Sequence, residues 1–135
     1  MNRLSPTILF ALFLLFGTNL TATAQETITG KFEHVVLFFL NNPDDEAEKA
    51  KLETGLRNLI KNSEFIVSAH LGVPAMTPRN VVDNSYSFNY TVTFDSKEAQ
   101  DKYQVEPVHL EFIETHKHLW SKVLIYDSIN LLNSE

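Results

Sequence analysis

The clearest pattern in the chain is the alternation of hydrophobic and polar residues between positions 85 and 94. Successive side chains of a β-strand point to opposite faces, so this segment predicts a strand with one apolar and one polar face. Its apolar face would consist of Tyr86, Phe88, Tyr90, Val92 and Phe94. Residues 31–40 are also typical of a strand, but both of their faces are largely apolar, which indicates cover on two sides.

Residues 43–62 carry leucines at helical spacing and predict the first helix. Asn42 is suited to cap this helix, and Pro43 to occupy its first position. The other predicted elements are strands over residues 65–72 and 122–131, a short helix over residues 97–104, and a helix from Pro107 to about Trp120.

The resulting β-α-β-β-α-β order is typical of a ferredoxin-like α+β fold, with helices on one face of a four-stranded antiparallel sheet. Apolar residues nevertheless occur at both odd and even positions of the predicted strands, and therefore on both faces of the sheet. Those assigned to the face away from the helices are Val35, Leu37, Phe39, Ile66, Val123 and Ile125, opposite to Val36, Phe38, Val67 and Leu124. The simplest cover is a second copy of the sheet, which would form a homodimeric α+β barrel. The alternative is a monomer whose termini or long loop, residues 73–84, fold over that face.

The first 24 residues have the layout of a secretory signal peptide. Arg3 precedes an apolar run over residues 8–16, too short to span a bilayer as a helix, and Ala22-Thr23-Ala24 suits cleavage before Gln25. An uncleaved N-terminal anchor is the alternative. We therefore expect one domain over residues 25–135, with its core at about 32–129, in a periplasmic or secreted protein that is not membrane-bound after cleavage.

Charge and composition narrow the possible functions. The formal net charge of −6 and the lack of a basic cluster argue against nucleic-acid binding. The chain has no cysteine, which removes disulfides, thiol catalysis and thiolate metal sites. An exported domain without disulfides depends on packing or on association for its stability.

The candidate chemistry centres on the helix after Pro107. Helical spacing places His109 and His116 on its inward stripe and His118 towards solvent. His109 lies near the start of the helix, where the helix dipole disfavours the charged imidazolium, so it could act as a base. Tyr103 and His34 could reach the same space.

A mostly apolar pocket between sheet and helices would then bind a flat, hydrophobic molecule bearing a hydroxyl or carbonyl group. His109 would remove a proton, and Tyr103 would donate a hydrogen bond to the developing oxyanion. The alternative is a filled core whose polar atoms satisfy one another. The lining residues would be His34, Val36, Phe38, Phe88, Tyr90, Phe112, His116 and Trp120.

Metal and cofactor sites are not expected. His109 and His116 are two helical turns apart and cannot share one ion, and no other spacing is typical of a metal site.

Four segments in order give the chain a family resemblance between Phe32 and Ile129. They are residues 33–39 (EHVVLFF), 93–96 (TFDS), 103–109 (YQVEPVH) and 120–127 (WSKVLIYD). Together they resemble the stress-responsive A/B barrel (Dabb) family. The resemblance implies a ferredoxin-like protomer that pairs into a dimeric α+β barrel.

The resemblance also implies site residues. In a plant polyketide cyclase of this family, a tyrosine and a histidine with the same separation as Tyr103 and His109 are thought to close an aromatic ring, and His34 matches a pocket histidine. The cyclase has histidines where this chain has Glu106 and Phe88, so the resemblance carries over the site and not the reaction.

Three functions remain open from the sequence. The first is a small-molecule-binding dimer without catalysis. The second is an enzyme that uses His109 and Tyr103 on an aromatic or keto compound, as a cyclase or isomerase does. The third is a haem- or quinone-related monooxygenase-like barrel with His116 as the axial ligand.

Overall fold

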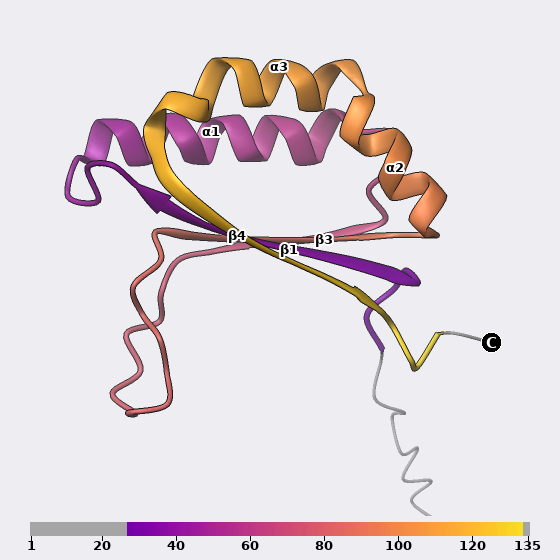
Figure 1. The fold of residues 1–135 in the computed structure, drawn as a ribbon, viewed down its shortest axis with the longest axis horizontal. Coiled ribbons are helices and arrows are strands. Elements are labelled where there is room, and N and C mark those ends of the chain that lie inside the picture. The colour runs from indigo at the N-terminus through magenta and orange to yellow at the C-terminus, as the bar shows by residue number, and fades with distance from the viewer. Residues whose placement is uncertain (1–26, 134–135) are drawn as a thin grey trace, which may run out of the picture.

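The predicted α+β fold is confirmed by the computed structural model, which describes residues 27–133 (Figure 1). The predicted signal peptide lies outside the described residues, so cleavage before Gln25 stays a prediction that the intact mass of the exported protein would check. The elements in order are β1 (Phe32–Leu40), α1 (Glu46–Asn62), β2 (Ser68–Gly72), β3 (Phe88–Phe94), α2 (Lys97–Val105), α3 (Pro107–His116), a 3₁₀ turn η1 (Lys117–Leu119) and β4 (Trp120–Ile129).

The four strands form one antiparallel sheet in the order β2-β3-β1-β4. The helices cover one face of this sheet (Figure 1). β1 pairs with β3 on one side and β4 on the other, so its backbone is hydrogen-bonded along both edges. Its side chains alternate between buried and half-buried, with the buried set facing the helices. No helix within residues 27–133 is both long and apolar enough to span a membrane.

Strand register corrects the faces predicted for the last strand. Val36 pairs with Ile125, and Phe38 pairs with Val123. Residues directly opposite each other in a sheet share a face, so Val123 and Ile125 lie on the helix side and Leu124 lies on the other. Alternation shows which residues of one strand share a face, but it does not show the register between strands.

The face predicted for residues 66 and 67 was also wrong. Ile66 packs against the core, whereas Val67 is exposed. Both residues precede β2, which begins at Ser68 and not at residue 65. The alternation of side chains between the two faces, which holds within a strand, therefore does not apply to these two residues.

An apolar strip remains on the sheet face away from the helices. Its residues lie on β1 and β4, where Leu37 pairs with Leu124 and Val35 pairs with Tyr126. The side chains of Val35, Leu37 and Leu124 are half-buried, and Tyr126 is 59% exposed. The loop between β2 and β3 extends away from the sheet at one end and does not cover this strip (Figure 1). We call Val35, Leu37, Phe39, Leu124 and Tyr126 the open face.

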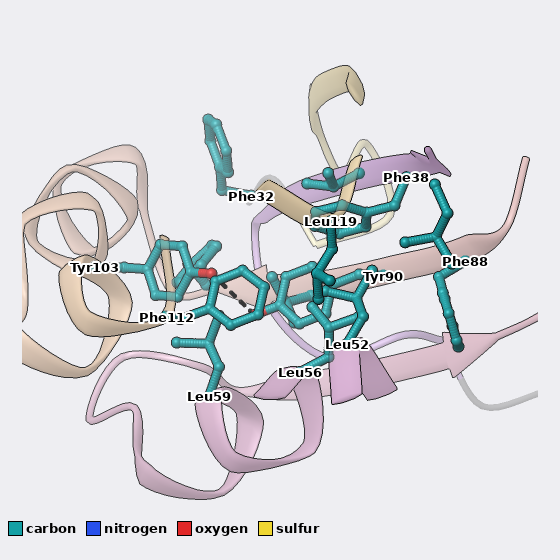
Figure 2. Packing of buried hydrophobic residues seen from close by; sticks show 14 residues of the cluster. Phe32, Phe38, Leu52, Leu56, Leu59, Phe88, Tyr90, Tyr103, Phe112 and Leu119 are labelled. Atoms are coloured by element: carbon teal, nitrogen blue, oxygen red, sulfur yellow. Dashed lines mark hydrogen bonds between the residues drawn. The ribbon is translucent and has the colours of Figure 1, made fainter. Parts of the chain in front are cut away.

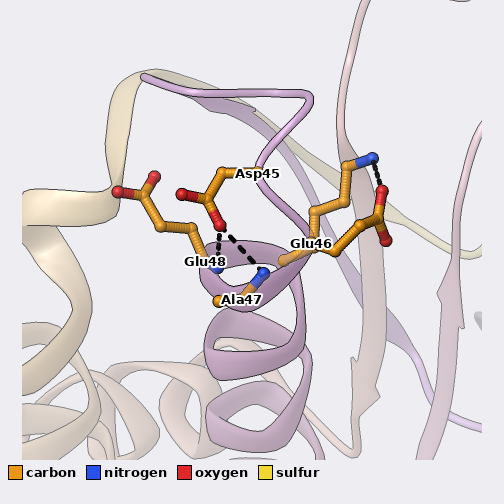
Figure 3. Close-up of polar contacts among 5 residues, drawn as sticks. Asp45, Glu46, Ala47 and Glu48 are labelled. Carbon is orange, nitrogen blue, oxygen red and sulfur yellow. Dashed lines mark hydrogen bonds and ion pairs between the residues drawn. The ribbon is translucent and has the colours of Figure 1, made fainter.

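The cap of α1 differs from the prediction. Asp45, and not Asn42, is the N-cap, because one of its carboxylate oxygens accepts hydrogen bonds from the backbone N–H groups of Ala47 and Glu48 at 2.9 and 3.1 Å (Figure 3). Pro43 lies in the preceding turn and not at the first helical position. The Asp45 carboxylate satisfies two of the backbone N–H groups that have no partner within the helix. A proline at the first helical position would satisfy none of them and would only lack an N–H group itself.

Other element ends shift by a few residues. β3 begins at Phe88 and not at residue 85. The helix after Pro107 ends at His116 and tightens into η1, so β4 begins at Trp120, two residues earlier than predicted, and ends at Ile129. Such 3₁₀ turns are frequent at the ends of α-helices.

The core lies between the sheet and the helices (Figure 2). Leu52, Leu56 and Leu59 of α1 are fully buried there, as their spacing predicts. Gly55 on the same helix allows α3 to approach closely, because a Cβ atom at Gly55 would lie 2.5 Å from Nε2 of His116. That ring is held in place, since its Nδ1–H donates to the Phe112 carbonyl at 2.9 Å.

We expect Gly55→Ala to lower the free energy of unfolding by about 1 kcal/mol, because displacing the His116 ring outweighs the ~1 kcal/mol that alanine adds to a helix. In a His116→Ala background the same substitution should instead raise stability by about 1 kcal/mol. Urea denaturation of the four proteins measures this coupling, with Thr54→Ala on the exposed side of α1 as the control. Equal effects in both backgrounds would contradict the contact.

Candidate functional site

The hydroxyl groups of Tyr90 on β3 and Tyr103 on α2 form a buried pair between the sheet and the helices. Their oxygens lie 2.9 Å apart, and each residue is only 1% exposed (Figure 2). Burial raises the pKa of both phenols well above the usual value near 10. Both hydroxyls therefore stay protonated at neutral pH, and either can donate a hydrogen bond.

His109 lies in the first turn of α3, against Tyr103. The two ring centroids are 4.5 Å apart, and the His109 side chain is half-buried. Its Nδ1–H donates to the backbone carbonyl of Gln104 at 3.1 Å, since a carbonyl can only accept. This bond leaves Nε2 as an unprotonated acceptor. Burial lowers the pKa of His109, and this effect outweighs the hydrogen bond to Gln104 and the nearby Glu106 carboxylate, which raise it, so the ring is neutral at pH 7.

His34 approaches the same tyrosine from β1. Its ring centroid lies 6.2 Å from that of Tyr103, and the residue is 4% exposed. Nδ1 of His34 lies 2.6 Å from a carboxylate oxygen of Asp127, to which it donates. Asp127 fixes the tautomer of His34 and leaves Nε2 as the acceptor. The structure thus brings His34, Tyr103 and His109 together.

Sequence reasoning missed the part played by Asp127. The partners are 93 residues apart in the chain, and only the antiparallel register of β1 and β4 places them opposite each other. Alternation within the two strands does not give that register, so the sequence held no signal for this pair.

The remaining predicted lining residues are packed within the core. Phe38, Phe112 and Trp120 contact one another, with ring centroids 5.0 to 6.3 Å apart. Val36 and Phe88 are buried in the same cluster. These side chains lie on the sheet–helix boundary, as predicted, and whether they move apart for a ligand stays a prediction.

His116 lies further along α3 and faces α1. Its Nδ1–H is bound to the Phe112 carbonyl, and its Nε2 points at Gly55. Both ring nitrogens are therefore directed into the protein, which does not favour the axial-ligand role of a haem protein. Among residues 27–133, no three acidic or histidine side chains are grouped as metal ligands would be.

The larger described pockets lie at the two ends of the helix layer. One, of about 570 Å³, opens between the start of α1 and the loop before β3, and Phe88 is the predicted lining residue that it contacts. The other, of about 500 Å³, lies where α1 ends and α2 meets α3, and includes Glu106. Neither is lined by His34, Tyr103 or His109.

The model of the stress responsive A/B barrel domain matches residues 32–130, most of the chain. The chain belongs to the stress responsive A/B barrel domain (Dabb) family. The resemblance predicted from the sequence is confirmed.

Some relatives of this Dabb chain are named as enzymes, and others carry no stated activity. Olivetolic acid cyclase from Cannabis sativa is 25% identical over 95 residues, which cover 70% of this chain and 92% of the cyclase. The Arabidopsis thaliana protein At3g17210 is 27% identical with a TM-score of 0.61, over 72% of this chain and 92% of that one. A dimeric ferredoxin-like protein of unknown function from Thermobifida fusca shares the fold at 15% identity, with a TM-score of 0.62, over 78% and 97% of the two chains.

The lowered pKa of His109 predicts a pH dependence of stability. Histidine in the unfolded chain has a pKa of about 6.5, so below that pH the unfolded state binds a proton that the folded state resists. The free energy of unfolding should therefore fall as the pH drops from about 6.5 through the lower pKa of folded His109. Denaturation of the wild type and of His109→Gln between pH 5 and 8 measures the effect. The variant should show a shallower fall, and identical slopes would contradict the assignment.

Proposed function

We propose that this Dabb protein is an exported homodimer that binds a small hydrophobic or aromatic molecule between its sheet and helices, at His109. The observation that carries the proposal is the neutral, half-buried His109 ring with an accepting Nε2, which lies tilted against the ring of Tyr103, whose hydroxyl is paired with that of Tyr90. This arrangement offers a hydrogen-bond acceptor, Nε2 of His109, and a hydrogen-bond donor, the tyrosine hydroxyl, among apolar side chains. A few polar groups in apolar surroundings are typical of sites for small organic ligands.

The open face supports the homodimer. Its aliphatic and aromatic side chains form a continuous strip on β1 and β4 that the helices leave uncovered (Figure 1). A second sheet packed face to face would bury this strip. The dimeric Thermobifida fusca protein of the same fold is consistent with that arrangement.

Leu37→Glu should convert the dimer to a monomer, because the substitution places a charge at the centre of the open face, where association would leave it unpaired. Light scattering after size-exclusion chromatography measures the mass, with Glu111→Gln on the exposed side of α3 as the control. A monomeric wild type would overturn the proposed dimer, and a dimeric Leu37→Glu would place its interface elsewhere.

The polar groups of the site define the chemistry of the ligand. His109 Nε2 can accept from a hydroxyl group, and a tyrosine hydroxyl can donate to a carbonyl oxygen. A flat aromatic ketone with a phenolic hydroxyl combines both features. Such a ligand would enter as the aromatic side chains at the sheet–helix boundary separate.

A second function is favoured by the same histidine. Nε2 of His109 is the basic atom, and a proton α to a carbonyl group is one that it could remove. As that proton leaves, negative charge moves to the carbonyl oxygen, to which Tyr103 could donate a hydrogen bond. The 25% identity to a cyclase supports this chemistry without specifying the substrate.

One probe, 4-hydroxyacetophenone, tests binding and catalysis together. Saturable shifts of protein NMR signals near His109 are expected, and His109→Ala should weaken them at least fivefold, whereas His118→Ala on the solvent side should not. Exchange of the probe's methyl protons in deuterated buffer measures proton removal. Binding without exchange supports the first function, and exchange lost in His109→Ala supports the second. Absence of both, or binding that His109→Ala leaves unchanged, would contradict the site.

A further inference from the structure

A second pocket lies on the helix layer, at the junction of α2 and α3. Its volume is about 500 Å³. The residues that line it come from the end of α1 and the segment after it, and from both sides of the break between α2 and α3. The residues that line it are Asn62, Glu64, Phe65, Lys102, Val105, Glu106, Pro107 and Val108.

Glu106 is the buried polar residue of this pocket. It is 7% exposed, although glutamate is almost never buried without a partner. Its Oε1 atom has no hydrogen-bond partner among the described residues. Its Oε2 atom accepts one long bond, 3.3 Å, from the backbone N–H of Glu64. A buried carboxylate with so few donors is costly, and a ligand that supplies a donor would relieve that cost.

Glu106 occupies the junction between two helices without capping either one through its side chain. It is at once the C-cap of α2 and the N-cap of α3, and its φ of −68° and ψ of 148° are the extended values that a following proline favours. Its side chain makes no capping bond. The carboxylate is therefore available to a ligand without loss of a helix cap, and rotation about its last torsion, which is soft in glutamate, can turn either oxygen towards the pocket.

The charges of the lining residues select the ligand. Glu64 and Glu106 supply two carboxylates, and Lys102 is the one basic side chain among the residues that line the pocket. Phe65, Val105 and Val108 provide apolar surface next to them. A carboxylate in such surroundings binds a cation that donates hydrogen bonds.

We propose that this pocket binds a small organic ammonium ion, with its apolar body against Phe65, Val105 and Val108 and its N–H groups donating to Glu106. Helices α1, α2 and α3, which contribute residues to the pocket, cover the other side of the sheet from the open face (Figure 1), so the proposed dimer leaves the pocket accessible. The inference does not rest on the ligand proposed at His109.

Three probes of the same size separate the charge from the shape. Benzylammonium, benzyl alcohol and benzoate are titrated into the purified protein at pH 7, with calorimetry and the methyl signals of Val105 and Val108 as readouts. We expect benzylammonium to bind at least tenfold more tightly than benzyl alcohol, and benzoate not to bind. Equal affinities for the amine and the alcohol would overturn the proposal, as would the absence of amine binding.

Two variants test the residues. Glu106→Gln keeps the shape of the side chain and removes its charge, and should weaken benzylammonium binding at least tenfold, whereas Glu111→Gln on the exposed side of α3 should change it less than twofold. His109→Ala should also change it less than twofold, which separates this site from the one proposed above. An unchanged affinity in Glu106→Gln would contradict the proposal.

A third variant keeps the test valid if Glu106→Gln does not fold. Val105→Arg changes an exposed residue and places a positive charge at the mouth of the pocket. It should abolish benzylammonium binding while thermal stability is retained. Leu110→Arg, also exposed but outside the pocket, is the matched control and should bind as the wild type does. Wild-type binding by Val105→Arg would overturn the proposal.

Discussion

The central strand β1 imposes the constraint on which the rest of the structure depends. It is hydrogen-bonded along both edges and carries apolar side chains on both faces, so it needs cover above and below. The helices supply one cover, and the core and the histidine–tyrosine cluster lie between them and the sheet. The other face carries the open face, which the helices leave uncovered. The same strand therefore holds His34 in the candidate site and Leu37 in the open face, which links the integrity of the site to that of the proposed dimer.

Burial produces the chemistry of the candidate site. Removing the Tyr90 and Tyr103 hydroxyls from water keeps them protonated, and partial removal of His109 from water keeps its ring uncharged. No metal ion or strong ion pair is needed for this division into a donor and an acceptor. The backbone carbonyl of Gln104 fixes the tautomer of His109 and Asp127 that of His34, so each histidine has one defined accepting nitrogen.

The sequence predicted the order of the elements, the helix-facing side of β1 and the stripe of α3, because each depends on periodicity within one element. It failed where two elements meet. Val123 and Ile125 were assigned to the wrong face because alternation carries no information on register, and Asp127 was missed for the same reason. The cap of α1 was misplaced because Asn42, Asp44 and Asp45 are all suitable N-cap residues, and only the observed hydrogen bonds decide between them. Glu106 could be noted as unusual but not recognised as buried.

The break between α2 and α3 has an evolutionary consequence. A proline disfavours helical backbone in the residue before it, and Glu106 is extended, so Pro107 helps to set the angle between the helix that carries Tyr103 and the helix that carries His109. Position 106 can then change from a charged to a neutral side chain of similar size without altering the backbone that spaces those two rings. Within one fold, substitution at this single position could change which compounds a lineage recognises while the pair beside it is inherited intact.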